Sequence, residues 1–453
     1  MRLSLTLGAA LAAVASATPR YIFYLDQWHL TTLPDKAVTA GVTHVITAFA
    51  NSSLFAAEPA GKYEPFKPLK EIRALFDDNV QVCMAIGGWA DTAGFGEGAK
   101  SDATRRKYAK NIADTLDRLG YDCVDIDWEY PGGNGADYKQ IPNSKKTSEI
   151  KSYPKLLKEI KRAIGTKELS IAVPGLERDM IAYTHEQVPK INEVVDFVNL
   201  MSYDLMNRRD HFTSHHTSFE GTAKTVDAYI SRGFEPSKLI IGFPFYAKWF
   251  TTKEGVECTE STGCPTELLE AADGSDTGKS GSVTFEAANF VPAPTNLTTS
   301  TDASCGAGTF FKCGEVQCCS QFGFCGNSTA HCATGCQSAY GRCEGTDITA
   351  SFRKALENGQ TDAAAGAQWF WDSETRLYWS WDTAELITLK IFGLIPTKGL
   401  GGIMAWSLGQ DSHDWSHIKA MQDGFKALSG KARDVKVDIQ AGYKGRHGYR
   451  HAH

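Results

Sequence analysis

Several features that define other classes of protein are missing from this chain of 453 residues. It has no excess of basic residues, since the formal net charge is -6 at pH 7, and it therefore lacks the electrostatic footprint of a nucleic-acid partner. After the first 17 residues no apolar run is long enough to span a bilayer, which argues against a membrane partner. No repeat of fixed period indicates a solenoid. We expect one large globular domain with an accessory unit, and a neutral partner.

The first 17 residues have the pattern of a secretory signal peptide. Arg2 precedes an apolar run, and the small residues Ala15, Ser16 and Ala17 predict cleavage after Ala17. The segment is too short and too weakly flanked for a membrane anchor. Twelve cysteines suit the oxidising compartment that such a peptide implies. We expect a secreted, extracellular protein.

Apolar, β-rich runs alternate with helical patterns along most of the chain. The predicted strands are residues 21–25, 44–49, 81–86, 123–128, 168–173, 197–203, 239–246 and 402–407. The predicted helices include residues 105–119, 148–164, 222–232, 384–394 and 415–428. Strand followed by helix, repeated, predicts parallel strands with right-handed crossovers. Eight such units predict an α/β fold, a (β/α)8 TIM barrel, with its chemistry at the carboxyl ends of the strands.

The stretch between the seventh and eighth strands is too long for a loop. It predicts a small α+β insertion and an inserted disulfide-rich module, with aromatic runs on either side of residues 372–376 forming a hairpin of the insertion. The expected divisions are a signal peptide (1–17), the first part of the catalytic barrel (18–250), insertion and linker (251–301), the module (302–345), the rest of the insertion with the last barrel unit (346–428), and a basic, disordered tail (429–453). Three histidines near the end of that tail, His447, His451 and His453, are weak metal candidates because no second ligand cluster supports them.

Residues 121–130, YDCVDIDWEY, carry the strongest chemical signal. Alternation of period two predicts a strand, which places Asp125, Asp127 and Glu129 on one face. Like charges at close range force at least one of these groups to stay protonated at neutral pH, which is how a carboxyl becomes a general acid. The alternatives are a solvated acidic strand and a carboxylate metal site, and a chelator would abolish activity only in the second case.

This stretch also resembles the DxxDxDxE signature of glycoside hydrolase family 18, the chitinase family, including the Trp-Glu-Tyr-Pro that follows at 128–131. The resemblance implies that Glu129 is the catalytic acid and base, that Asp127 holds the substrate acetamide, and that Asp125 shares a proton with Asp127. It also implies that the attacking group is the substrate's own N-acetyl oxygen.

The ends of other predicted strands carry further motifs of this family. Residues 201–204, MSYD, resemble its MxYD motif, which implies that Tyr203 is catalytic and that Met201 and Asp204 contact the substrate. Trp406, in GGIMAWS, matches the tryptophan that floors the central sugar site. The remaining substrate-binding candidates are Gly88, Trp89 and Tyr130.

Two positions depart from the family pattern. Ala85 stands where the SxGG motif has serine, so a hydrogen bond near the acids is expected to be missing. After Asp204 the chain runs LMNRRDHFTSHH instead of the usual His/Gly-x-Trp, which makes Arg208 or Arg209 a candidate for lining the product side.

Eight cysteines fall within forty residues, where so little chain cannot bury enough apolar surface without disulfides. They imply four bridges, with zinc as the alternative: Cys305, Cys313, Cys318, Cys319, Cys325, Cys332, Cys336 and Cys343. The run CCSQFGFCG at 318–326 resembles the hevein-like chitin-binding module. This implies binding through Ser320, Phe322 and Phe324, with His331 where that family usually has tyrosine. The alternative is that the two phenylalanines only cover the disulfide core.

The pairing of the other four cysteines, Cys83, Cys123, Cys258 and Cys264, is left open by the sequence. The expected function is that of a secreted, retaining endochitinase with no cofactor and no metal, a monomer acting on chitin or N-acetylglucosamine oligomers. One alternative is an endo-β-N-acetylglucosaminidase acting on N-glycans. The other is a non-catalytic chitin-binding lectin, which the presence of Glu129 disfavours, since family lectins typically lose this acid.

Overall fold

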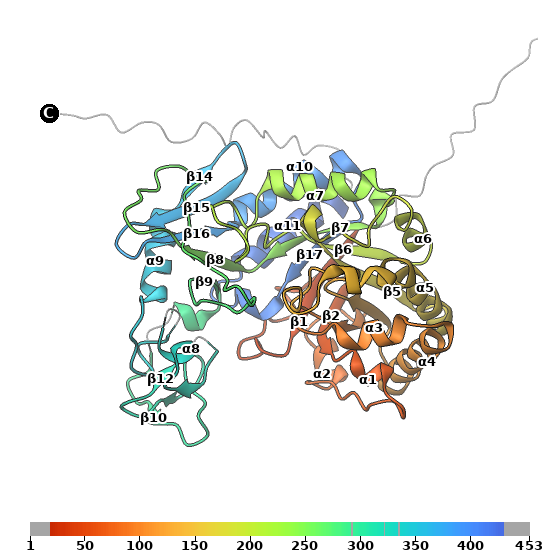
Figure 1. Cartoon of the computed structure of the whole chain (residues 1–453), viewed down its shortest axis with the longest axis horizontal. Coiled ribbons are helices and arrows are strands. Elements are labelled where there is room, and N and C mark those ends of the chain that lie inside the picture. The colour runs from red at the N-terminus through yellow and green to blue at the C-terminus, as the bar shows by residue number, and fades with distance from the viewer. Residues whose placement is uncertain (1–18, 291–292, 321, 334–335, 430–453) are drawn as a thin grey trace, which may run out of the picture.

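Eight parallel strands close into a barrel in the computed structural model, which describes residues 19–290, 293–320, 322–333 and 336–429. The barrel strands are β1 (Arg20–Asp26), β2 (His44–Ala50), β3 (Gln81–Gly87), β4 (Cys123–Asp127), β5 (Glu168–Pro174), β6 (Phe197–Met201), β7 (Leu239–Pro244) and β17 (Gly402–Trp406). Strands β1 to β7 pair in parallel in chain order, and β17 closes the ring between β7 and β1. The predicted TIM barrel is confirmed (Figure 1).

Helices cover the outside of the barrel. They are α1 (Ser53–Ala56), α2 (Leu69–Arg73), α3 (Ala93–Ala99), α4 (Asp102–Leu119), α5 (Thr147–Ile164), α6 (Val188–Asn192), α7 (Phe219–Ser231), α10 (Ala384–Lys398) and α11 (Ser416–Ser429). The ends of α4 show why they form where they do: Ser101 and Thr104 make a capping box at its start, and Gly120 takes the left-handed conformation after its end. The strand–helix order is broken between β1 and β2, which no helix separates, and after β7, which leads directly into an insertion.

The alternation along each strand divides the core in two. Val124 and Ile126 of β4 point outward, into the large apolar layer between the strands and helices. Ala85 and Cys123 belong to a smaller cluster inside the barrel. Cys83 and Cys123 are register partners on β3 and β4 and form a disulfide, which settles a pairing that the sequence left open.

A five-stranded antiparallel sheet with one helix interrupts the barrel between β7 and β17. Its elements are β8 (Tyr246–Thr251), β9 (Ser280–Thr284), α9 (Ile348–Asn358), β14 (Gln360–Asp362), β15 (Ala367–Asp372) and β16 (Leu377–Trp381). The predicted aromatic hairpin is confirmed as β15 and β16. The seventh strand was predicted too long: it ends at Pro244, and Tyr246 already starts β8, which pairs with β9 and β16. The insertion therefore begins earlier than the expected boundary at 250–251.

The cysteine-rich module lies between β9 and α9, below the insertion sheet in the view of Figure 1 and apart from the barrel helices. Its elements are short: β10 (Thr298–Thr299), β11 (Phe311–Lys312), β12 (Cys318–Cys319), β13 (Cys325–Gly326) and α8 (Thr329–Cys332). The four expected bridges are present as Cys305–Cys319, Cys313–Cys325, Cys318–Cys332 and Cys336–Cys343. A sixth disulfide joins Cys258 to Cys264 in the insertion. The module is therefore stapled by covalent bonds, as its small size requires.

Two predicted segments, the signal peptide at 1–17 and the tail at 429–453, lie outside the described residues, except that Ser429 ends α11. Within the described part of the chain, no helix is both long and apolar enough to cross a membrane.

Candidate active site

The acids of β4 lie at the carboxyl end of the barrel, as the strand pattern predicts. Asp125 and Asp127 are buried on the inner face of the strand, and Glu129 follows two residues after the strand ends. Gly87, on the neighbouring strand, allows this close packing: its φ is +112°, and a Cβ atom there would lie 2.2 Å from the carbonyl oxygen of Asp127.

Asp125 is the deepest acid and has a full set of hydrogen-bond donors. It accepts bonds from the Tyr24 hydroxyl at 2.8 Å, from Ser170 at 2.6 Å and from the Asn199 amide at 3.2 Å. Burial raises its pKa to about 6, although these three donors favour the ionised form. The donors come from β1, β5 and β6, so three barrel strands hold this one carboxyl in place.

Asp127 has the opposite environment. Its Oδ1 atom is buried without a hydrogen-bond partner. Burial raises its pKa well above the usual range, and the neighbouring carboxyls of Glu129 and Asp125 raise it further. A buried polar atom with no partner inside the protein is a group that a bound molecule can satisfy.

Glu129 is the most exposed of the three acids of this segment, at 9%. Burial raises its pKa to about 7, the Tyr130 hydroxyl acts against this shift, and the charges of Asp204 and Asp179 add to it. A carboxyl with this pKa is protonated in a large share of molecules near neutral pH. It therefore has the property required of a general acid.

The segment after β6 faces these acids across the cavity. Tyr203 is largely buried, its ring contacts Tyr246 edge-on at 6.2 Å, and burial raises its pKa well above 10, which keeps the hydroxyl protonated. Asp204 has a φ of +53° and accepts a 2.9 Å hydrogen bond from Tyr246. Its partial burial acts to raise its pKa, but Lys248 at 3.1 Å and the ring of His216 outweigh this and lower it. Asp204 is thus a fixed negative charge beside the acid.

A cavity of about 700 Å³ is lined by Asp127, Glu129, Tyr203 and Asp204. Trp406 lines its floor, with its ring stacked on Phe49 at 5.5 Å and an interplanar angle of 19°. Gly88, Met201, Trp89 and Tyr130 also line it, and Trp89 is 40% exposed, so its indole is free to contact a ligand. Every substrate-binding residue predicted for the barrel thus lies at one site.

Several residues of this site carried no sequence signal of their own. Tyr24, Ser170 and Asn199 contact Asp125 from strands far apart in the sequence, and only barrel closure brings them together. Lys248 comes from β8 of the insertion, of which only Tyr246 was predicted as strand. Both Arg208 and Arg209 line the cavity, as expected for the unusual segment after Asp204.

The module presents its aromatic residues to solvent. Phe322 is 73% exposed and Phe324 is 58% exposed, so they do not serve as a cover for the disulfide core. Ser320 is buried, and its hydroxyl accepts a 3.2 Å hydrogen bond from the Phe324 backbone, which shapes the loop that carries the ring. His331 is partly exposed, and its ring Nδ1 lies 2.7 Å from the Ser328 hydroxyl.

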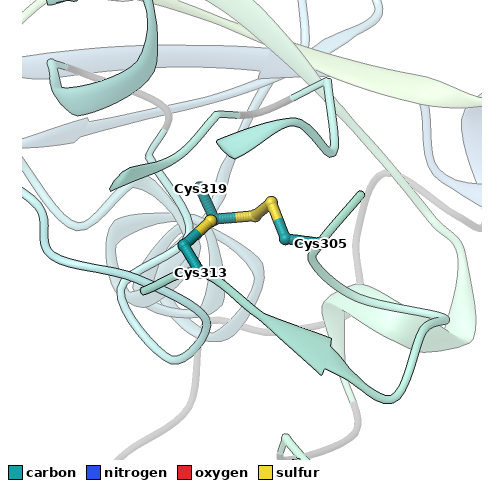
Figure 2. A group of neighbouring side chains, drawn as sticks. All are labelled: Cys305, Cys313 and Cys319. Carbon is teal, nitrogen blue, oxygen red and sulfur yellow. A yellow bond between two sulfur atoms is a disulfide. The ribbon is translucent and has the colours of Figure 1, made fainter. Parts of the chain in front are cut away.

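One group of three side chains in the described ranges has potential metal-ligand atoms within reach of one another, and it lies in the module rather than among the acids. It consists of Cys305, Cys313 and Cys319. Figure 2 shows the bond between the sulfur atoms of Cys305 and Cys319, and Cys313 is bonded to Cys325. Sulfur atoms in disulfides are not thiolate ligands, so the zinc alternative for this cluster is wrong.

The model of the family described as glycosyl hydrolases family 18 matches residues 20–411. The chain belongs to this family. The match includes β4, the segment after β6 and β17, which together form the site described above.

Chitinases are among the relatives of this family 18 chain. Chitinase 1 of Aphanocladium album is 27% identical over 259 residues, which cover 49% of this chain and 59% of that protein. Chitotriosidase-1 of Mus musculus is 30% identical over 229 residues, 46% of this chain and 48% of that protein. The chain thus spans about half the length of the curated relatives it matches.

Solved structures support the fold. The second catalytic domain of the Ostrinia furnacalis Group II chitinase superposes with a TM-score of 0.61 at 21% identity, covering 91% of this chain and 97% of that domain. A chitinase from Rhizomucor miehei gives a TM-score of 0.60 at 17% identity, covering 89% and 99%.

Proposed function

We propose that this family 18 protein is a secreted chitinase that hydrolyses the β-1,4 bonds between N-acetylglucosamine units with retention of configuration. The observation that carries the proposal is the arrangement of Glu129, Asp127 and Tyr203 around one cavity floored by Trp406. An acid with a pKa near 7 stands beside a buried carboxyl oxygen that lacks a partner and a hydroxyl that stays protonated. These are the groups needed to break a bond with a poor leaving group next to an acetamide.

The first step uses all three groups. Glu129 donates its proton to the bridging oxygen as the glycosidic bond breaks, and the acetamide oxygen of the same sugar attacks the anomeric carbon. The ring formed carries a positive charge and an N–H, which the unpartnered Oδ1 of Asp127 accepts. Tyr203 donates a hydrogen bond that orients the acetamide oxygen. Trp406 stacks on the sugar and excludes water from it.

The second step returns the protein to its starting state. Glu129, now a carboxylate, takes a proton from a water molecule, whose oxygen attacks the anomeric carbon from the face that the leaving group vacated. The bond to the acetamide oxygen breaks. Two displacements at the same carbon give net retention, and no covalent bond to the protein forms.

The proposal also assigns roles to the cysteine-rich module, in binding chitin, and to residues 1–17, in secretion. The exposed rings of Phe322 and Phe324 are flat surfaces on which sugar faces stack, so we assign the module to retention on insoluble chitin. The relatives named above are chitinases, and a chitinase from Cycas revoluta, another structural neighbour, has been solved in complex with (GlcNAc)3. The signal-like pattern of residues 1–17 supports secretion.

The test is hydrolysis of soluble N-acetylglucosamine oligomers by the wild-type protein and by Glu129→Gln, with binding of both to insoluble chitin. We expect Glu129→Gln to lose at least about a hundredfold in kcat while chitin retention is unchanged. A wild-type protein that binds chitin but cleaves no oligomer contradicts the proposal. Release of glycan from a high-mannose glycoprotein without oligomer cleavage would favour the endo-β-N-acetylglucosaminidase alternative.

A further inference from the structure

Arg209 lies in the segment after β6 that departs from the family pattern, and three contacts hold its side chain. The guanidinium lies 3.9 Å from the centroid of the Tyr138 ring and 5.5 Å from that of Trp89. Its Nη2 donates a 2.8 Å hydrogen bond to the carbonyl oxygen of Asn134. The side chain is 13% exposed and lines the cavity. A planar cation held in this way has one orientation.

That orientation directs the guanidinium at Asp179. The Arg209 Nη1 lies 3.4 Å from Asp179 Oδ1. Asp179 ends the 3-10 turn η2 (Glu177–Asp179), which follows β5, and it is buried in the cavity wall. The Nε of Arg178 is 3.9 Å from Asp179 Oδ2, but the Nη1 of Arg178 binds Asp210 at 2.7 Å. Arg209 is therefore the cation that reaches Asp179 from the cavity side.

Asp179 and Asp204 are the two carboxylates outside β4 whose charges act to raise the pKa of Glu129. Each has a cation from a different element. Lys248 of the insertion pairs with Asp204 at 3.1 Å, and Arg209 pairs with Asp179. The charge around the acid is thus balanced on two sides by residues from separate segments.

We propose that Arg209 is a positioning residue for the acid step, which holds Asp179 in an ion pair and thereby sets the proton occupancy of Glu129. The inference rests on the proposed function, in which Glu129 is the acid. Burial raises the pKa of Asp179, and the Arg209 charge acts against this shift. Without the guanidinium, Asp179 would hold a proton more often, and its negative charge would then no longer raise the pKa of Glu129. The role is electrostatic and acts through Asp179, the carboxylate that Arg209 contacts.

Other titratable groups face Glu129, Asp179 and Arg209, and they come from several neighbouring elements. Around Glu129 and Asp179 they are Asp125, Asp127, Tyr130, Tyr203, Asp204, Tyr246, Lys248, Arg178 and Asp210. Around Arg209 they are Tyr138 and, through Tyr138, Glu270 and Arg208. None of these is altered in the test below except Arg208, which serves as the control.

Arg208 is a matched control for charge. It is the adjacent residue, it lines the same cavity, and its Nε donates a 3.0 Å hydrogen bond to Glu270 of the insertion rather than to Asp179. Replacing either arginine removes one positive charge from the same segment. The two substitutions differ in which carboxylate is left unpaired.

The experiment is the pH dependence of kcat/KM on a soluble N-acetylglucosamine oligomer. Loss of the Arg209 charge favours protonation of Asp179, which removes part of the negative charge that raises the pKa of Glu129, so the basic limb moves to lower pH. For Arg209→Gln we expect a fall of about half a pH unit or more. We expect Arg209→Lys, which keeps the charge, to restore the wild-type limb, and Arg208→Gln to leave it nearly in place.

A second variant tests the route through Asp179. Asp179→Asn removes the same negative charge permanently and should move the basic limb in the same direction as Arg209→Gln, to lower pH. In the Asp179→Asn background, Arg209→Gln should then produce little further shift. Three results would each overturn the inference. In the first, the pH profiles of wild type and Arg209→Gln superimpose. In the second, Arg208→Gln shifts the limb as much as Arg209→Gln does, and in the third, Arg209→Gln shifts the limb equally in the Asp179→Asn background. Full activity of Glu129→Gln would instead overturn the proposed function.

Discussion

Ser170 on β5 donates a 2.6 Å hydrogen bond to Asp125 on β4, at the position directly opposite Ala85 on β3. Ala85, Asp125 and Ser170 are register partners across the three strands. The serine hydroxyl that the family pattern leads one to expect on β3 is therefore replaced by one from the other neighbouring strand. The expected loss of a hydrogen bond near the acids is compensated.

Ser170→Ala should reduce kcat by about tenfold, because a buried charged acceptor loses a partner and this typically costs about 1–3 kcal/mol. The pKa of Asp125, already raised by burial to about 6, would rise further. Ser202→Ala is the matched control: this serine is also buried, but its hydroxyl donates to the carbonyl oxygen of Gly242. Steady-state kinetics that show equal losses for both variants would contradict the assigned role.

Activity should fall as the pH rises through about 7, since Glu129 donates a proton only from its protonated form and burial raises its pKa to about 7. The Glu129 charge also raises the pKa of Asp127, so the limb reports the ionisation of both carboxyls. The measurement is the basic limb of kcat/KM against pH for the wild-type protein. A limb near pH 4.5, the ordinary value for glutamate, would show that Glu129 is not desolvated as the structure indicates.

Tyr203→Phe should lower kcat by about a hundredfold, because the variant keeps the ring but removes the hydroxyl assigned to the acetamide. Tyr108→Phe is the control, since that hydroxyl is buried in the helix layer without a partner and lies away from the cavity. Comparing kcat for both variants on the same oligomer separates loss of a catalytic hydroxyl from loss of a buried hydroxyl in general. Similar kcat values for Tyr203→Phe and wild type would remove Tyr203 from the mechanism.

Much of the barrel and its acids followed from local patterns. The inner face of β4 was predictable because strand alternation is a property of consecutive residues, and the acids sit at positions 125, 127 and 129. The hydrogen-bond partners of Asp125 could not be predicted, because Tyr24 and Asn199 reach it only after β1 and β6 join the closed barrel. The boundary between β7 and β8 was missed for a related reason: residues 239–247 contain no charged residue, and the apolar run continues past Pro244, where the chain changes from one sheet to the other.

The ion pair of Lys390 and Asp382 offers a test of stability away from the site. Both side chains are fully buried, the ammonium lies 2.6 Å from Asp382 Oδ2, and Thr217 accepts a further bond from it at 2.7 Å. Lys390→Met should lower the free energy of unfolding by about 3–5 kcal/mol, since it leaves a buried carboxylate unpaired. Lys398→Met, which removes a lysine paired with exposed Asp227 at 2.6 Å, should cost less than about 1 kcal/mol in urea unfolding.

The exposed rings of the module lead to a prediction that separates binding from catalysis. Replacing both Phe322 and Phe324 by alanine should weaken retention on insoluble chitin by about tenfold or more, since stacking surface for the sugar is lost. The hydrolysis of short soluble oligomers should not change, because neither ring lines the cavity. Phe212→Ala is the control, because Phe212 is 61% exposed but lies outside the module. If the double variant binds chitin as wild type does, the module does not bind through these rings; if it loses oligomer cleavage as well, the two functions are not separate.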